Sequence, residues 1–519
     1  MITRLKIDGF KNLVDVDIQF GSFTCIAGTN AVGKSNLFDA IKFLSDLTHK
    51  TLVDAAKSVR SEGQKNSDIR DIFHKVGDIY ADKMSFEVDM ILPKTGIDDF
   101  GQLATATTTA VKYKLILGYK KVNDIIPQGD LEIIEEWLKP IKPSEAINSI
   151  KFYDNSDFKT KPYKEQQDLK KNELEWKKSI IIGKRNNSRE FISTEGENEN
   201  RKINFHQDGG SSGKPAGRMA KQLPKTILSS ANASENPTTL IAKNEMQSWI
   251  LLQLEPSALR KSDEFNAIKN ARLNEDGSHL PATLYRLKTE NPEKDIYQQL
   301  ANRLSELIDG VKDIDIDKDE KRELLTLILR GKDNTPLPAR ALSDGTLRFL
   351  GLSVLELDSK SAGVICLEEP ENGIHPEKIA AMLKLLQDIA MDTMLPVNDD
   401  NPMRQVIINT HSPLVVQQVP EESLLVAELK ESIKYNGIRF KKSVFSALNN
   451  TWRTKTTQEE PMHTISMGTL LAYLNATVQP IDDNIFISNN NGNNFNFNSK
   501  PIRVIDRKDI QNQLRLFEN

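Results

Sequence analysis

Hydrophobic and polar residues alternate at the start of the chain and change to a helical spacing within the first fifty residues. ITRLKIDGF at 2–10 alternates as a half-buried strand does, and SFTCIAG at 22–28 is a short apolar run that ends in glycine. NLFDAIKFLSDL at 36–47 has the spacing of an amphipathic helix. The apolar residues on one stripe of this helix are Leu37, Ile41, Leu44 and Leu47. We therefore predict strand, strand, loop and helix over residues 1–50.

After this helix, the pattern divides the chain into clear and unclear parts. MSFEVDMIL at 84–92 and VKYKLILGY at 111–119 are two further expected strands. Residues 120–240 are rich in Lys, Glu, Asn and Ser and include DGGSSGKPAG at 208–217, which predicts a loop. The Asn-rich stretch at 489–498 predicts a mobile tail. No internal repeat or sustained heptad pattern is present in the sequence, so no long coiled coil is expected.

These elements indicate an α/β protein with a discontinuous core. We expect residues 1–50 and 339–430 to form a core with a mixed nucleotide-binding sheet. We assign a β-rich subsheet and an inserted helical region to residues 51–338, and a C-terminal region with the Asn-rich tail to residues 431–519.

Composition narrows the class of protein. The 519 residues are 38% hydrophobic and 27% charged, with two cysteines and mean hydropathy -0.46, as in a globular protein of a reducing cytoplasm. No apolar run is long enough to span a membrane, and the N-terminus lacks the features of a secretory signal. The net charge of -4 means that nucleic-acid binding would need a local basic patch. The candidate patches, which are better explained as solvated faces, are Lys170, Lys171, Lys177 and Lys178, and Lys434, Arg439, Lys441 and Lys442.

The segment GTNAVGKS at 28–35 carries the clearest chemistry. It fits G-x-x-x-x-G-K-[ST] and lies between an expected strand and an expected helix, which is the context that a phosphate-binding P-loop requires. Glycines at both ends let the backbone amides face phosphate groups, and the helix adds its positive end. Lys34 is expected to contact the β- and γ-phosphates of ATP, and Ser35 to bind Mg²⁺. The expected cofactor-binding residues of the loop are Asn30, Gly33, Lys34 and Ser35.

Three later segments add a second set of candidate residues. GVICLEEPENGIHP at 363–376 is a buried strand that ends in Glu368 and Glu369, the places of a metal-linked acid and a catalytic base. ALSDGTLRFL at 341–350 opens an apolar helix, and VIINTHSP at 406–413 is an apolar run before a histidine. Each segment alone has an ordinary structural explanation, and their order along the chain gives them weight. The candidate residues in these two segments are Ser343, Gly345 and His411.

P-loop, Ser-Asp-Gly-Thr, acidic strand end and histidine, in this order, resemble an ABC-type ATPase. The resemblance implies that two heads pair head to tail, and that Ser343 and Gly345 of one head contact the γ-phosphate held by the other. It implies that Glu369 activates or positions the attacking water, that His411 stabilises the γ-phosphate, and that Glu368 helps to hold Mg²⁺ through water. The family usually has Asp at the position of Glu368, and no Q-loop glutamine is placed in residues 95–240.

Further segments resemble one branch of that family. FKNL at 10–13 resembles the opening of RecF, SMC and Rad50-like heads, and EEPENGIHP at 368–376 resembles the corresponding run of OLD and RecF-like AAA proteins. LEPSALR at 254–260 and NEDGSHLPATLYRL at 274–287 also resemble that group. Together these segments resemble the stand-alone OLD-like ATPases of bacterial defence systems, of the type of PtuA in Septu and retron systems. This resemblance implies a slow, ATP-gated homodimer or higher oligomer that controls a separate HNH-type effector nuclease.

Two alternatives remain open at this point. A RecF- or Rad50-like repair ATPase would grip DNA between its paired heads, although the acidic pI of about 6.1 is unfavourable for DNA binding. A nuclease site within residues 430–519 would use Glu459, Glu460 and His463. Three such residues in a polar tail are usually only solvated.

Overall fold

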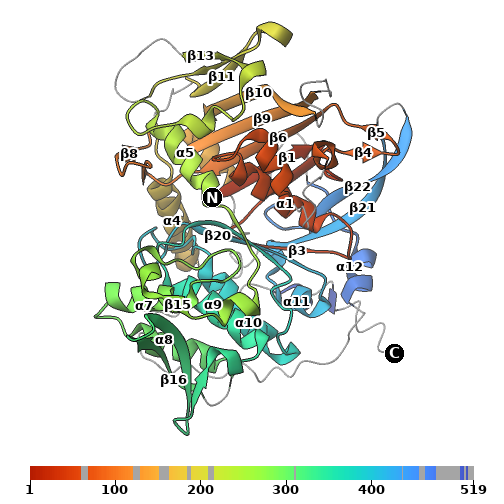
Figure 1. Ribbon diagram of the computed structural model, residues 1–519. Helices are drawn as coiled ribbons and strands as arrows, with labels where there is room; N and C mark the ends of the chain where they lie inside the picture. Colours follow the sequence, from red (N-terminus) through yellow and green to blue (C-terminus); the bar gives the residue numbers. More distant parts are fainter. Residues whose placement is uncertain are drawn as a thin grey trace.

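A six-stranded, mostly parallel sheet forms the centre of the molecule (Figure 1). The computed structural model describes residues 1–59, 68–120, 129–150, 163–183, 189–208, 216–308, 311–434, 437–454, 462–474, 503–507 and 510–511. In spatial order the strands of the central sheet are β14 (Ile250–Leu252), β19 (Gly363–Glu368), β20 (Arg404–Thr410), β3 (Phe23–Ala27), β21 (Leu424–Lys434) and β22 (Ile438–Ala447). All neighbours are parallel except β21 and β22, which form an antiparallel hairpin.

Both faces of this sheet are covered, as its apolar sequence requires. Successive residues of β3 point to opposite faces. Cys25 and Ala27 belong to the core on the helical side, whereas Ile26 belongs to the core on the other side. Both cysteines of the chain are buried, and neither forms a disulfide, as expected from the sequence.

Helix α1 (Lys34–Asp46) follows the P-loop and lies between two sheets. The sequence predicts one buried stripe, but Phe38 and Phe43 are fully buried as well as Leu37, Ile41 and Leu44. The reason is a second sheet, which covers the face of α1 that would otherwise meet water. The ring of Phe43 lies 5.8 Å from that of Phe10 and 5.7 Å from that of Phe86, and both partners belong to the N-terminal part of this second sheet or its first turn.

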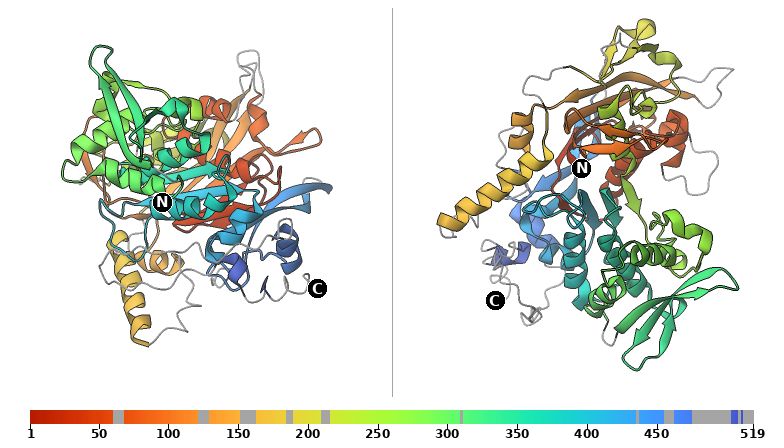
Figure 2. Two further views of the ribbon diagram at one scale, coloured as in Figure 1. Left: turned by 90° about the horizontal axis from the view of Figure 1, so that it is seen from below. Right: turned by 90° about the vertical axis from the view of Figure 1, so that its left-hand side faces the viewer.

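The second sheet is antiparallel and has eight strands. In spatial order they are β13 (Ala216–Met219), β12 (Lys202–Phe205), β11 (Ile192–Glu195), β10 (Asp130–Pro140), β9 (Ala110–Lys120), β6 (Lys83–Ile91), β1 (Ile2–Asp8) and β2 (Val16–Gln19). Helix α2 (Leu52–Ser58) and helix α5 (Pro237–Gln247) belong to the same half, and the hairpin of β7 (Thr95–Ile97) and β8 (Leu103–Thr105) contacts α5. Helices α3 (Pro143–Ser149) and α4 (Tyr163–Ile180) complete this half, and α4 projects from the body of the molecule (Figure 2).

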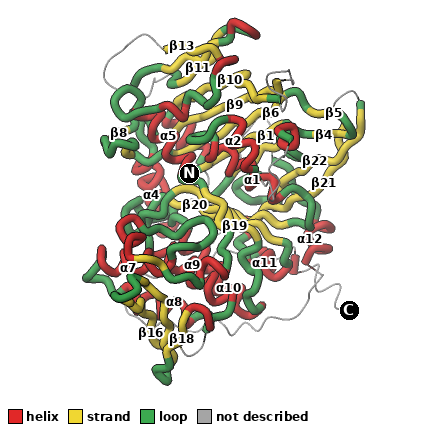
Figure 3. Tube along the Cα trace, viewed as in Figure 1, coloured by secondary structure: helices red, strands yellow, loops and turns green. Residues whose placement is uncertain are grey.

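Helices dominate the half on the opposite face of the central sheet (Figure 3). They are α6 (Pro256–Leu259), α7 (Leu280–Glu290), α8 (Ile296–Ser305), α9 (Asp344–Leu357), α10 (Ile379–Ile389), α11 (Pro413–Gln418) and α12 (Met467–Leu474). A small sheet of β15 (Asp263–Glu264), β16 (Val311–Asp319), β17 (Leu324–Gly331) and β18 (Pro336–Pro338) packs against them. A buried ion pair of 2.6 Å between Arg286 and Asp358 joins α7 to the end of α9.

The observed architecture confirms the α/β class, the mixed sheet, the β-rich N-terminal subsheet and the inserted helical region. The strands expected at 84–92 and 111–119 are β6 and β9. Strands β14 and β22 of the central sheet lie outside the segments 1–50 and 339–430 that the sequence predicts for the core. Most of the loop expected at 208–217 and the whole Asn-rich stretch at 489–498 lie outside the described residues. Within the described part, every helix is too short or too polar to cross a bilayer.

A buried carboxylate of the antiparallel sheet accepts hydrogen bonds from a segment that follows β13 in the chain. Glu136 of β10 is fully buried and accepts hydrogen bonds from the amides of Ile227 and Leu228, at 2.8 and 3.0 Å, and from the hydroxyl of Tyr113 at 3.2 Å. Burial raises the pKa of this carboxyl to about 7, although the three donors act in the opposite direction.

This pKa predicts a pH-dependent stability. Because the folded pKa lies above the ordinary value of 4.5, the contribution of Glu136 is fully present below about pH 4.5 and is lost as the pH rises through 7. The free energy of unfolding should therefore fall by on the order of 3 kcal/mol from this group between pH 5 and pH 8. Denaturant unfolding at both pH values measures it, with Glu136→Gln as the control that lacks the titration. Equal pH dependence in both proteins would contradict the prediction.

Candidate functional site

Three neighbouring strands of the central sheet end at the same level and bring distant segments together. In the register of β19, β20 and β3, Glu368 lies opposite Asn409, and Thr410 lies opposite Ala27. The P-loop therefore begins beside Thr410, the residue before His411, and one strand further along the same edge lies the acidic end of β19. Ligands of open α/β sheets bind at this carboxyl edge.

The P-loop has the backbone conformation that its two glycines allow. Gly33 has φ 98°, and a Cβ placed there would lie 2.2 Å from the hydroxyl oxygen of Ser443. A Cβ on Gly28 would lie 2.7 Å from the carbonyl oxygen of Ala427. A side chain at either position would therefore clash with the strand hairpin beside the loop, so both glycines are needed for this backbone path. Asn30 is exposed on the loop, as a residue that contacts a ligand must be.

Lys34 lies inside this loop. Its ammonium donates to the carbonyl oxygens of Gly28 and Thr29, at 2.7 and 2.8 Å, and the residue is only 6% exposed. Burial lowers the pKa of this lysine, while the carboxylates of Glu369, Glu368 and Glu371 act to raise it. The charges of the P-loop lysine and of the acids at the end of β19 therefore influence each other.

Glu368 and Glu369 are adjacent, yet the backbone allows both to serve the site. Glu368 is the last residue of β19, whereas Glu369 has φ 46°, in the left-handed region that is uncommon for a side-chain-bearing residue. The amide of Glu369 donates to the carbonyl oxygen of Asn409 at 3.0 Å and to its side-chain oxygen at 3.1 Å. Buried Asn409 therefore fixes the turn, a role that sequence reasoning missed. A polar residue inside the apolar run VIINT was the available signal.

Glu369 and His411 form a pair. Nδ1 of His411 lies 2.7 Å from Oε1 of Glu369, and the Asn372 amide donates to Oε2 at 2.9 Å. Burial acts to raise the pKa of Glu369, but the hydrogen bonds from Asn372 and His411 and the charge of Lys34 prevail, so its pKa is lowered. The sequence predicts both residues separately, and the structure brings them into contact.

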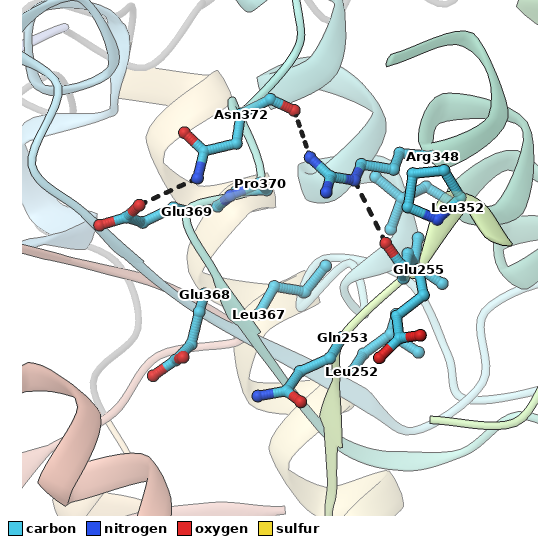
Figure 4. Close-up of a pocket in the computed structure, with 12 residues that line it drawn as sticks. Leu252, Gln253, Glu255, Arg348, Leu352, Leu367, Glu368, Glu369, Pro370 and Asn372 are labelled. Carbon is cyan, nitrogen blue, oxygen red and sulfur yellow. Dashed lines mark hydrogen bonds between the residues drawn. The ribbon is translucent and has the colours of Figure 1, made fainter. Parts of the chain in front are cut away.

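Gln253 is a further residue of the site that sequence reasoning missed. It directly follows β14, whose Leu252 pairs with Leu367 of β19, so Gln253 lies beside Glu368. A cavity of about 210 Å³ is lined by Gln253, Glu368 and Glu369 among other residues. Figure 4 shows the Gln253 amide and the Glu368 carboxylate pointing in the same direction. The position lies just beyond the range 95–240 considered for a Q-loop glutamine.

Ser343 caps helix α9, as predicted. Its side chain accepts from the Thr346 amide at 3.2 Å, and Ser343 is exposed. The neighbouring Asp344 is held by Arg260 of the LEPSALR segment at 2.6 Å. Gly345 is buried, since a Cβ there would lie 2.2 Å from the carbonyl oxygen of Gly373. The start of α9 is thus packed directly on the loop that follows the acids.

Arg348 strengthens this connection. Its guanidinium donates to the carbonyl oxygen of Asn372 at 2.6 Å and to that of Leu254 at 3.2 Å (Figure 4). One side chain of α9 therefore holds both the loop after Glu369 and the segment after Gln253.

The residues present fit a nucleotide with Mg²⁺. The amides of the P-loop, the N-terminus of the 13-residue helix α1 and Lys34 offer positive charge to phosphates, and no acidic residue lies in the first turn of α1. Ser35, Glu368 and Gln253 offer the oxygen ligands that Mg²⁺ prefers.

The structure adds little support for the other candidate sites, which are the C-terminal nuclease site and the two basic patches. His463 is described, but Glu459 and Glu460 lie outside the described residues, and no cluster of three or more potential metal ligands occurs in the described part. Several cations of the candidate basic patches lie close to acids. The ion pairs are Lys171–Glu175 at 3.9 Å, Lys177–Glu173 at 2.6 Å and Lys442–Asp15 at 3.3 Å. The side chains of Lys170 and Lys434 lie outside the described part.

A P-loop between a strand and a helix, with a glutamate-histidine pair on the next two strands, defines a P-loop ATPase head. The comparison with family models agrees with this class. The chain belongs to the family described as "AAA domain, putative AbiEii toxin, Type IV TA system", whose model matches residues 23–417.

Solved structures with similarity to the chain include three SMC heads. The SMC head bound to the C-terminal winged-helix domain of ScpA is 14% identical, covers 86% of this chain and 98% of its own, and has a TM-score of 0.43. The SMC head with an extended coiled coil bound to ScpA, derived from Pyrococcus furiosus, is 12% identical, with 86% and 96% coverage and a TM-score of 0.38. The SMC head from Thermotoga maritima is 12% identical, with 86% and 99% coverage and a TM-score of 0.34. No curated protein matches the chain.

The contact between Gly345 and Gly373 predicts a cost for any side chain there. Gly345→Ala should lower the free energy of unfolding by about 1–3 kcal/mol, because a Cβ would meet a backbone oxygen that cannot move alone. Gly351→Ala in the same helix is the matched control, since its nearest neighbour is the end of the Leu259 side chain at 3.2 Å. Denaturant unfolding compares the two, and equal effects would contradict the packing described.

Proposed function

We propose that this chain is an ABC-type ATP switch in which two copies pair head to tail around ATP and Mg²⁺. The contact between Glu369 and His411, in the field of Lys34, is the observation that carries the ATPase chemistry. The exposed start of α9 supports the pairing, because Ser343 and Asp344 are open to a second copy. In this proposal Ser343 of one copy contacts the γ-phosphate held by Lys34 of the other, whereas Gly345, which is buried against Gly373, positions the start of α9.

Each residue then has a defined task. Lys34 and the loop amides neutralise the phosphates, and Glu369 orients the attacking water and accepts its proton. His411 holds Glu369 through Nδ1 and is proposed to stabilise the γ-phosphate. Bound Mg²⁺ would neutralise the developing charge, with Ser35 as a direct ligand and Glu368 and Gln253 holding its water.

The proposed turnover is slow. Two hydrogen bonds and a nearby cation lower the pKa of Glu369, and a carboxylate of lower pKa is a weaker base. Glu368 also differs from the usual Asp by one methylene. A slow ATPase suits a switch, which needs occupancy of the site more than rapid hydrolysis.

Replacement of the proposed base tests the switch. Glu369→Gln should reduce hydrolysis about 100-fold while ATP still binds, and should therefore accumulate the paired state. Light scattering with ATP measures the mass, and radiolabelled ATP measures turnover. Glu377→Gln is the matched control, because Glu377 is an exposed acid on the same segment. An unchanged mass for Glu369→Gln with bound ATP would exclude ATP-driven pairing.

Gln253 predicts a dependence on metal concentration. Gln253→Ala should raise the Mg²⁺ concentration for half-maximal turnover about tenfold, because residues that hold metal-bound water tune metal affinity by such factors. Gln298→Ala on α8, which removes an exposed amide, is the control. A change in turnover that saturating Mg²⁺ does not correct would assign Gln253 a role other than metal binding.

The biological setting is proposed from the sequence resemblance to ATPases of defence systems. We propose a cytoplasmic complex of a prokaryotic defence system in which this ATPase controls an HNH-type effector nuclease. The family description, which refers to a putative toxin of a toxin–antitoxin system, is compatible with this setting. The mass of the complex purified from its native operon identifies the effector. A repair clamp would instead show DNA-stimulated hydrolysis that weakens with salt.

A further inference from the structure

The tip of the β7–β8 hairpin exposes three large apolar side chains. Ile97 is 60% exposed, Phe100 97% and Leu103 66%. Ile97 and Leu103 are directly opposite each other in the pairing of β7 with β8, so they share one face of the hairpin, and Phe100 lies in the turn that joins the strands. Single exposed apolar residues are ordinary, whereas several on one surface element mark an interaction site.

Hydrogen bonds fix the backbone of this turn. The carboxylate of Asp98 accepts from the amides of Phe100 and Gln102, at 3.0 and 2.9 Å. The carbonyl oxygen of Ile97 accepts from the side chain of Asn244 on α5 at 2.8 Å. The backbone that carries Phe100 is therefore ordered before any partner binds, which reduces the entropy lost on binding.

Acids accompany the apolar residues of the tip. Asp98 and Asp99 directly precede Phe100. Asp99 is exposed, with Nζ of Lys243 at 3.8 Å from its carboxylate. An anionic lipid surface would repel these acids, whereas a protein surface with apolar and cationic side chains would match them.

The β21–β22 hairpin of the same chain has a surface of this kind. In the register of the two strands, Ile433 is opposite Arg439 and Glu431 is opposite Lys441. Because alternate residues of a strand share a face, Leu429 lies on the same side as these four residues. All five side chains are exposed, and Ile433 is 64% exposed. This face therefore has two apolar residues, two cations and one acid.

The opposite face of the β21–β22 hairpin faces the body of the molecule. The ring of Phe440 lies 4.9 Å from that of His74, and Lys442 forms an ion pair with Asp15 at 3.3 Å. The face with Leu429 and Ile433 is therefore the outer one. Figure 1 places β8 and the β21–β22 hairpin on opposite sides of the molecule, so the two surfaces of one chain do not meet.

We propose that the β7–β8 tip of one copy docks on the outer face of the β21–β22 hairpin of a second copy. Phe100 would pack against Leu429 and Ile433, because an aromatic side chain on a fixed backbone is a typical anchor of an interface. Asp98 and Asp99 would lie beside Arg439 and Lys441, which steer the two surfaces together.

This contact goes beyond the ATP-dependent pairing proposed above, since it uses other surfaces and needs no nucleotide. It joins two different surfaces, so it is heterologous, and each copy keeps one free surface of each kind until a ring closes. Copies that also pair around ATP would then assemble into larger particles.

Sedimentation of nucleotide-free protein tests the contact. The mass of the wild-type protein should rise with concentration up to about 100 μM, the range in which transient contacts are detected. Phe100→Ser and Ile433→Ser should each raise the Kd of association about 30-fold, which corresponds to about 2 kcal/mol. Leu395→Ser is the matched control, because it removes a half-exposed leucine of another surface loop and should leave association unchanged.

Mixing the two variants tests whether the contact joins two different surfaces. Phe100→Ser keeps an intact outer face and Ile433→Ser keeps an intact tip, so an equimolar mixture should form heterodimers and no larger species. Asp99→Lys and Arg439→Glu should each weaken association, and the double variant should recover it, because the charges are complementary again.

Three results would overturn the proposal: a wild-type protein that stays monomeric, association that survives Phe100→Ser, or a mixture without heterodimers. The first would leave the tip to a different protein or to a membrane, and the third would indicate contact between two tips. Because no nucleotide is present, these outcomes are independent of ATP-driven pairing. Failure of Glu369→Gln to pair with ATP would contradict the proposed function alone.

Discussion

The buried ammonium of Lys34 is the interaction on which the rest of the site depends. The negative charges of Glu369, Glu368 and Glu371 act to raise its pKa against the effect of burial. Burying charges of one sign costs several kcal/mol each, so the cation and the acids must be brought together. The parallel register of β3, β20 and β19 does this, because it ends the three strands at one level. The sheet order is therefore inseparable from the charge balance of the site.

Local chemistry made part of this site predictable from sequence. The P-loop is contiguous, and its glycines, lysine and serine have roles set by neighbouring residues. The motif GTNAVGKS is therefore recognisable as a P-loop from sequence alone. Glu368, Glu369 and His411 were also recognisable, because each follows an apolar strand. Their contact was not predictable, since it depends on the register of β19 with β20 and on the positive φ of Glu369.

The missed residues depend on pairings between distant parts of the chain. Gln253 follows a strand of only three residues, which becomes a strand by pairing with β19 more than 100 residues later. Helix α12 lies in the C-terminal region, and only tertiary packing brings its Leu470, Leu471 and Leu474 into the helical core. The all-round burial of α1 has the same origin, because Phe10 and Phe86 come from segments far apart in the chain that meet over the helix only in the assembled antiparallel sheet.

The contacts of Gly345 and Arg348 with the loop after Glu369 join the start of α9 to the nucleotide site, so the two parts should move together. In the proposed pair, the nucleotide site would hold ATP at the P-loop of its own copy, and the start of α9 would face the nucleotide of the partner copy. In such a pair, a shift of the acidic loop during hydrolysis would displace Ser343 at the partner's nucleotide, so the two proposed sites would be coupled.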